Sequence, residues 1–160
     1  MNKSASQLNL RHLDETGKWV GKFDPSLQFF AERILVRCKR CRKCAEVRSD
    51  DYDEQKRIFV TESSCSHCGE IWTIRKKRLR DSYHELPLWL QTRCCGEVLW
   101  ALNEEHLRYL EMYLGARVRT RAFGQNSSIA ARLPKWMTAA KNREAVEKAL
   151  GRLRKMLLPG

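Results

Sequence analysis

The pattern of apolar and polar residues changes along the chain from strand-like to helical. Residues 34–36 form a continuous apolar run, and residues 70–74 alternate as the residues of strands do. The acidic run over residues 49–54 lies between them and predicts a loop at the far end of the strands. We therefore expect antiparallel strands within residues 31–78.

The apolar spacing becomes helical after Asn103. This residue is a good N-cap, and the acidic residues Glu104 and Glu105 suit a first turn, where the helix dipole favours negative charge. We expect the helix to end in the basic residues of segment 117–121. Its apolar stripe consists of Leu107, Leu110, Leu114 and Val118.

Two further helices are expected before the end of the chain. A short helix over residues 129–133 should stop at Pro134, because the residue before a proline disfavours the helical conformation. Asn142 is expected to cap a final helix. The apolar stripe of that helix consists of Val146, Leu150, Leu153 and Leu157, with Lys148, Arg152 and Lys155 on its other faces.

These patterns together predict an α+β fold. The segment over residues 1–30 begins with a polar stretch and is expected to be partly mobile. Residues 31–78 form the antiparallel part. A connector over residues 79–87 leads to a small, mainly α-helical domain over residues 88–160.

Five of the seven cysteines lie in two clusters within the antiparallel part. A Cys-x-x-Cys turn presents two thiolates to one ion, and two such turns complete the tetrahedral four-sulfur shell that structural zinc prefers. Cys65 and Cys68 form one such turn, and Gly69 after them suits a backbone with positive φ. His67, inside the turn, is expected to face solvent as a spacer. The spacing predicts a zinc ribbon.

The first ligand pair has two solutions, because Cys38, Cys41 and Cys44 are evenly spaced. Cys38 with Cys41 follows directly on the apolar run, which is typical of a strand entering the turn. Cys41 with Cys44 instead matches the sequence around Cys65 and Cys68 position for position. We take Cys38, Cys41, Cys65 and Cys68 as the predicted zinc ligands, with Cys44 at the start of the outgoing strand or as an exchange ligand.

Cysteine usage also bears on the compartment. The number of cysteines, seven, is odd, and no charged and apolar leader with a cleavage site opens the chain, so nothing indicates export. We expect a cytoplasmic protein, because a reducing compartment leaves thiols available for zinc. No apolar run approaches the length of a membrane span, and no membrane partner is expected.

The chain carries 31 basic and 19 acidic residues, which gives a net charge of +12. Such an excess favours a polyanionic partner, most simply DNA or RNA, through phosphate contacts that release counterions. Part of the excess has a second explanation, because basic residues beside the first cysteines neutralise a zinc centre that carries a charge of about −2. The predicted nucleic-acid contacts are Arg37, Lys39, Arg40, Arg75, Lys76, Lys77, Arg78, Lys135, Lys141 and Arg143.

No arrangement of residues predicts an enzyme. Hydrolytic zinc chemistry needs an open coordination position and a base, whereas the histidines are scattered. The cluster of Asp81, His84 and Glu85 is typical of a turn. The adjacent Cys94 and Cys95 are expected to pack in the interior, with a second metal or a redox pair as the alternative. No small-molecule substrate is expected.

Three motifs in the second half carry a resemblance: Leu-Pro-Leu-Trp-Leu at residues 86–90, Cys-Cys-Gly at 94–96, and Leu-Pro-Lys-Trp-Met at 133–137 with Ala-Lys-Asn-Arg after it. They are similar to a group of small bacterial zinc-ribbon proteins. The resemblance covers residues 34–157 and implies a paired Cys-x-x-Cys module with a helical tail, but no mechanism, since that group has no established activity. The usual Cys-Pro-x-Cys-Gly of the first turn is altered here, with Lys39 and Arg42 in place of Pro and Gly.

The ribbon also resembles those of transcription factors and ribosomal proteins, in which the module grips nucleic acid or a polymerase. We therefore expect a non-enzymatic nucleic-acid-binding protein with a regulatory or accessory role. The alternative is an adaptor for a protein partner, in which the zinc is purely structural and the apolar residues 88–90 or 136–137 dock the partner. An exposed apolar patch and association that is insensitive to salt would favour the adaptor.

Overall fold

The computed structural model describes residues 27–53, 58–76, 86–116 and 129–158. The chain divides into two compact units. We call residues 28–91 and 100–103 the sheet unit, and residues 92–99 and 104–160 the main part of the helical unit. The α+β class is confirmed, with antiparallel strands toward the N-terminus and helices toward the C-terminus.

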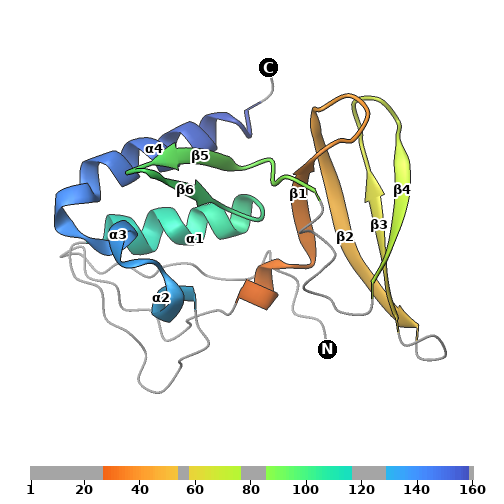
Figure 1. Ribbon diagram of the computed structural model, residues 1–160, viewed down its shortest axis with the longest axis horizontal. Helices are drawn as coiled ribbons and strands as arrows, with labels where there is room; N and C mark the ends of the chain where they lie inside the picture. The colour runs from red at the N-terminus through yellow and green to blue at the C-terminus, as the bar shows by residue number, and fades with distance from the viewer. Residues whose placement is uncertain (1–26, 54–57, 77–85, 117–128, 159–160) are drawn as a thin grey trace. The chain divides into compact units, whose positions relative to one another are not determined.

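Four antiparallel strands form the sheet unit, in the order in which they occur along the chain (Figure 1). One face of the sheet is buried, and there Val36 pairs with Ala45 and Val47 with Ser63. The alternate residues point to the other face, where Arg48 and its partner Glu62 are exposed. The strands are β1 (Arg33–Arg37), β2 (Cys44–Asp53), β3 (Ile58–Ser64) and β4 (Ile71–Lys76).

The outer edge of β1 is covered by later parts of the same unit. The backbone N–H of Leu35 donates to the carbonyl of Leu102 at 2.7 Å, and the carbonyl of Leu35 accepts from the N–H of Trp89 at 2.9 Å. The N–H of Arg37 donates to the carbonyl of Pro87 at 2.8 Å. These bonds satisfy backbone groups that an edge strand would leave open, and they tie residues of the 86–90 motif to the sheet.

The acidic run over residues 49–54 was predicted to be a loop, and this prediction is wrong for residues 49–53, which belong to β2. The pairing with β3 shifts between Ser49 and Tyr52, so that Asp50 and Asp51 together stand opposite Val60. Two residues opposite one define a β-bulge, which lets a strand continue through a sequence that disfavours regular pairing. The composition of the run indicated a turn, but the acidic residues are accommodated within the strand by the bulge.

The helical unit combines a short hairpin with helices (Figure 1). The apolar stripes predicted for the two long helices are confirmed for Leu107, Leu110 and Leu114 on one and for Val146, Leu150 and Leu153 on the other. Leu157 lies beyond the end of its helix and is half-exposed. Arg154 links these two helices through Glu111, 2.6 Å from Nη2 to Oε2. The elements are β5 (Gln91–Cys94), β6 (Glu97–Trp100), α1 (Glu104–Gly115), α2 (Ile129–Arg132), α3 (Lys135–Thr138), the 3-10 turn η4 (Ala140–Asn142) and α4 (Arg143–Lys155).

Three details of the helical part differ from prediction. The helix α1 ends at Gly115, before the basic residues expected at its end, and Val118 lies outside the described residues. Asn142 does not cap α4 through its side chain, because η4 leads into the helix and holds Asn142 in a helical conformation. Its Nδ2 instead donates to the carbonyl of Trp136 at 2.9 Å. The hairpin of β5 and β6 was not predicted.

None of the helices in the described ranges is long and apolar enough to cross a membrane.

Candidate metal centre

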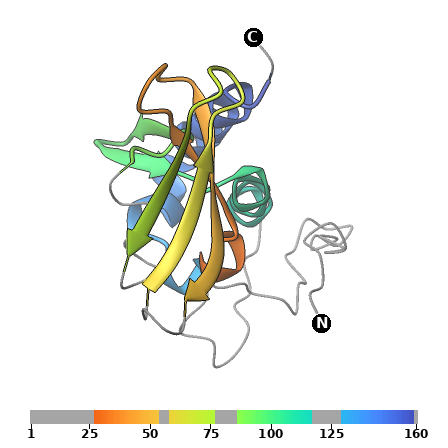
Figure 2. The ribbon, with the colours of Figure 1, turned by 90° about the vertical axis from the view of Figure 1, so that its right-hand side faces the viewer.

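Two turns of the sheet unit have the same backbone geometry. In the first cysteine turn, residues 38–43, the N–H of Cys38 donates to the carbonyl of Lys43 at 2.8 Å, and the N–H of Arg42 donates back to Cys38 at 3.1 Å. In the second cysteine turn, residues 65–70, the N–H of Cys65 donates to Glu70 and the N–H of Gly69 donates to Cys65, both at 2.9 Å. Both turns lie at the same end of the sheet (Figure 2).

This match fixes the register that the sequence left open. Cys38 corresponds to Cys65 and Cys41 to Cys68, so that the position-for-position alignment of Cys41 and Cys44 with the second turn does not hold in the structure. Cys44 is the first residue of β2, as the first of the two interpretations expected. Its backbone carbonyl accepts a contact from the Sγ of Cys65 at 3.7 Å.

The four sulfur atoms of Cys38, Cys41, Cys65 and Cys68 lie within 4.8 Å of one another. Across the two turns, Cys38 Sγ is 3.7 Å from Cys68 Sγ, and Cys41 Sγ is 3.5 Å from Cys65 Sγ. A disulfide would need about 2.05 Å, so these are free thiols gathered around a common centre. Within the described part of the chain this is the one group of three or more Cys, His, Asp or Glu side chains placed to hold a metal ion.

The backbone of the first turn prepares Cys38 for ligation. The N–H groups of Cys41 and Arg40 point at its sulfur, the latter at 3.4 Å, and these bonds lower the pKa of Cys38 to about 7. A lowered pKa favours the thiolate, which is the form that binds metals. Burial has the opposite effect on Cys44 and raises the pKa of its thiol to about 11. The pKa values of Cys41 and Cys68 are raised as well, so it is position in the turn that separates Cys38 from Cys44.

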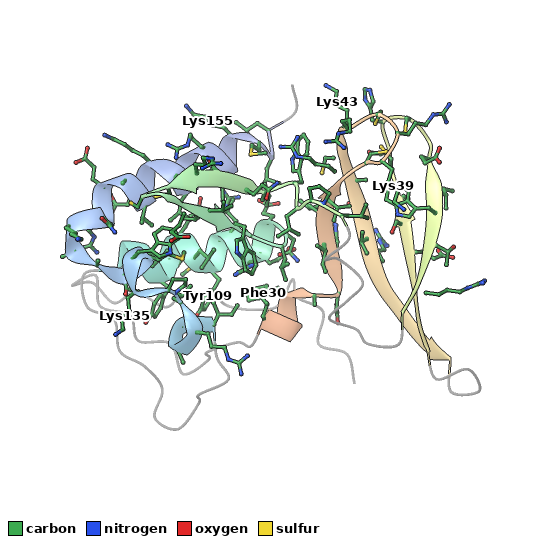
Figure 3. All side chains as sticks on the ribbon, in the orientation of Figure 1. Phe30, Lys39, Lys43, Tyr109, Lys135 and Lys155 are labelled. Carbon is green, nitrogen blue, oxygen red and sulfur yellow. The ribbon has the colours of Figure 1, made fainter. Side chains whose placement is uncertain are left out.

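Basic side chains surround the first turn. Lys39, Arg40, Arg42 and Lys43 are all exposed there, and Figure 3 shows Lys39 and Lys43 at the end of the sheet that carries both turns. Arg40 pairs with Glu70 of the second turn, 3.2 Å from Nη1 to Oε2. Arg42 has a φ of 63°, the left-handed conformation that Gly69 adopts in the second turn with 73°.

The other basic residues predicted in the sheet unit are placed differently. Arg37 is half-buried, and its guanidinium lies 5.2 Å from the ring centre of Trp89, a cation–π contact. Arg75 is exposed but pairs with Val60, so it lies about 13 Å along β4 from Ile71 and from the cysteine turns. Lys76 follows it in the same strand, and Lys77 and Arg78 lie outside the described residues. Arg75 therefore does not share a surface with the basic residues of the first cysteine turn.

In the helical unit, Lys135 and Lys141 are exposed. Arg143 has a structural role that the sequence did not reveal. Its Nη2 donates to the carbonyls of Ala116 at 2.7 Å and Gly115 at 3.3 Å, where α1 ends. A cation at the C-terminus of a helix satisfies carbonyls that lack helical partners and also opposes the dipole.

The structure also bears on the predictions made for His67 and for the adjacent cysteines Cys94 and Cys95. His67 is exposed within the second turn, as expected of a spacer. Of the adjacent cysteines in the helical unit, Cys94 is buried as predicted, but Cys95 is exposed. The prediction of a buried pair is therefore wrong for Cys95, because it lies in the turn of a hairpin that the sequence analysis did not recognise.

Comparisons with protein-family models, with curated proteins and with solved structures find no match for this chain. The resemblance to small zinc-ribbon proteins stays a prediction.

Proposed function

We propose that Cys38, Cys41, Cys65 and Cys68 bind one zinc ion and that the sheet unit is a zinc ribbon. A tetrahedral zinc with Zn–S bonds of about 2.3 Å places its sulfurs about 3.8 Å apart. The separations of 3.7 and 3.5 Å across the two turns are close to this value. Four thiolates also match the ligand preference of structural zinc sites.

The proposed role of this zinc is structural. Four protein ligands complete the shell and leave no position for a substrate or an activated water, which catalytic zinc sites keep. The metal would hold together the turn between β1 and β2 and the turn between β3 and β4. This supports a binding protein rather than an enzyme.

We further propose that the ribbon binds nucleic acid through the first cysteine turn, and the conformation of Arg42 carries this proposal. The corresponding position of the second turn is Gly69, because glycine adopts positive φ without strain. A residue with a Cβ pays about 1 to 2 kcal/mol for the left-handed conformation. An arginine at this position offers charge at the expense of stability, which is typical of a functional site.

The neighbours of Arg42 support the same role. Arg40 is paired with Glu70, so we assign phosphate contacts to Lys39, Arg42 and Lys43, which are exposed on the same turn. Neutralising a zinc centre of about −2 accounts for part of their charge. Long side chains that extend into solvent can nevertheless reach phosphates, and phosphate contacts fix a protein on nucleic acid without reading its sequence.

The test uses a variant that should fold at least as well as the parent. Lys39→Gln, Arg42→Gly and Lys43→Gln together remove three charges, and glycine suits the turn. The matched control, Arg108→Gln, Arg132→Gln and Lys155→Gln, removes three exposed charges from the helical unit. Affinity for a mixed-sequence oligonucleotide is measured against salt. We expect the turn variant to lose affinity and its salt slope to fall by about 2 to 3, since each phosphate contact contributes about 0.7 to 0.9.

An equal loss of affinity in the turn variant and the control variant would mean that net charge alone attracts the oligonucleotide. Binding by the parent that does not change with salt would favour the adaptor instead. Of the apolar residues considered for docking a partner, Leu90 and Met137 are buried and Trp89 and Trp136 only half-exposed. The structure of these segments therefore adds no support for the adaptor.

A further inference from the structure

A second pair of cysteines lies in the helical unit, where β5 turns into β6. Cys95 and Gly96 are the only residues between these strands, and their φ angles are 55° and 83°. Positive φ at both positions defines a type I′ turn, which prefers Asn followed by Gly. Gly96 fits this preference, whereas Cys95 occupies a conformation that residues with a Cβ rarely adopt. A reactive residue in a strained position is a reason to look for function.

The two thiols are set at a particular separation. Cys94 Sγ lies 3.6 Å from Cys95 Sγ. Neighbouring Cα atoms across a trans peptide are about 3.8 Å apart, closer than the roughly 4.4 to 6.8 Å that disulfides usually span, so a disulfide between these two residues would distort the turn. One thiophilic atom bonded to both sulfurs needs little movement, since two sulfurs on bonds of about 2.3 Å stand about 3.8 Å apart at a tetrahedral centre and about 3.4 Å apart at a pyramidal one. The turn therefore favours a bridging atom over a disulfide.

The two thiols have different surroundings: that of Cys95 is accessible, and that of Cys94 is held in place. Cys95 is exposed, whereas Cys94 is buried, and burial raises the pKa of the Cys94 thiol to about 11. Arg152 of α4 holds the strand that carries Cys94, because it donates to Thr92 Oγ1 at 3.2 Å and to the carbonyl of Arg93 at 2.8 Å. An incoming ligand would meet Cys95 first, and Cys94 would close the ring from a fixed position.

Because Cys94 and Cys95 offer only two sulfur ligands, they limit the kind of atom that can bind there. Among the described residues, the only group of three or more cysteine, histidine or acidic side chains placed for a metal is the one in the sheet unit. Two sulfurs do not complete the four-coordinate shell of structural zinc. The occupant must therefore prefer sulfur, need two protein ligands and bring its remaining substituent with it.

We propose that Cys94 and Cys95 form a dithiol site for a trivalent organic arsenical, R–As(OH)₂. In the binding reaction two As–O bonds break and two As–S bonds form. Each thiol proton leaves with one hydroxide, so that two waters are released and arsenic keeps its oxidation state. No oxidant or reductant is needed, and the hairpin keeps its turn. The site lies apart in sequence from the zinc ligands and does not depend on nucleic-acid binding.

The test uses phenylarsonous acid as the probe and the full, zinc-loaded chain. A large excess of glutathione removes arsenic held by a single thiol but leaves a chelate in place. Intact-mass measurement is expected to show one adduct per chain under these conditions, and peptide mapping is expected to place it on Cys94 and Cys95. A dithiol such as 2,3-dimercaptopropanol should reverse it. Zinc content, measured in parallel, should not change.

The decisive variant is Cys95→Asn, because asparagine is favoured at this turn position and the hairpin should fold. Removing the second thiol should raise the probe concentration for half-labelling by about 10²-fold or more, the advantage of a linked second contact. Cys95→Gly, which also accepts positive φ, repeats the test without the asparagine side chain. Labelling of either variant equal to the parent, or a retained adduct that maps to residues 38–68, would overturn the proposal.

Discussion

Asn103 donates from its side-chain Nδ2 to the backbone carbonyl of Arg33 at 2.6 Å, and the same nitrogen lies 2.8 Å from the carbonyl of Phe30. The sequence predicted Asn103 as the N-cap of α1, and the residue does precede that helix. Its amide nitrogen, however, joins two parts of the sheet unit that are 70 residues apart. Asn103 is also buried, so these hydrogen bonds have no competition from water.

Asn103→Asp separates this bridging role from capping. Aspartate keeps an acceptor for the helix N-terminus and adds favourable charge there, so that capping alone predicts unchanged or higher stability. It removes the donor and leaves the carbonyls of Arg33 and Phe30 facing a carboxylate. We expect the free energy of unfolding to fall by about 1 to 3 kcal/mol, the cost of a buried group without its partner. Denaturant unfolding measures it, and a stability equal to the parent would refute the bridge.

The cysteine turns predict a sharp difference between Cys38 and Cys44. Cys38→Ser removes a sulfur from the cluster and should release the metal, whereas Cys44→Ser should leave the metal in place. Metal analysis of the purified proteins checks both, and the expected parent value is about one zinc per chain. Metal loss only in the Cys44 variant would instead identify Cys41 and Cys44 as the first ligand pair. Because metal binding and folding are coupled in such modules, Cys38→Ser should also lose the strand signal but retain the helical one.

The sequence predicted the parts of the fold in which apolar periodicity dominates. The stripes containing Leu110 of α1 and Leu150 of α4 were visible because burial on one helical face requires that spacing. The hairpin of β5 and β6 was missed because its sequence signal is weak. Cys95 stands where two-residue hairpin turns usually have Asn, Asp or Gly before the second Gly, and four-residue strands give too little alternation to recognise.

The cysteine cluster could be predicted from spacing, but the choice between its two registers could not. Cys-x-x-Cys-x-x-Cys contains two identical spacings, and the backbone hydrogen bonds of the turn distinguish them only in three dimensions. The same limit applies to the basic residues. Composition cannot tell Arg42, exposed on a cysteine turn, from Arg143, which binds the end of α1. Whether a charged side chain is exposed or bound to backbone carbonyls depends on the tertiary structure.

Arg143 and Lys141 offer a matched pair for this distinction. Both were predicted to contact nucleic acid, but only Arg143 donates to the carbonyls of Gly115 and Ala116. Arg143→Gln should lower the free energy of unfolding by about 1 kcal/mol, because charge-assisted bonds to helix-end carbonyls are lost. Lys141→Gln removes the same charge from an exposed position and should change stability by less than about 0.5 kcal/mol. Thermal or denaturant unfolding compares them, and equal effects would contradict the capping role.

His106 should make the stability of the helical unit depend on pH. The residue is buried in α1, and burial lowers its pKa from 6.5 to about 3. Between these two values the unfolded chain binds a proton that the folded chain excludes, so stability falls as the pH decreases through this range. Above about pH 6.5 both states are neutral and the effect disappears. The slope should approach about 1.4 kcal/mol per pH unit, or about 2 kcal/mol between pH 7 and pH 5.

The variant His106→Gln cannot titrate, so it should lose this part of the pH dependence even if its stability at pH 7 is lower. Denaturant unfolding followed by helical circular dichroism, with parent and variant both zinc-loaded, gives the difference at each pH. Protonation of the cysteine thiolates acts on both proteins and cancels in the comparison. Parallel curves for parent and variant between pH 7 and pH 5 would show that the folded chain accepts a proton at His106, contrary to its burial.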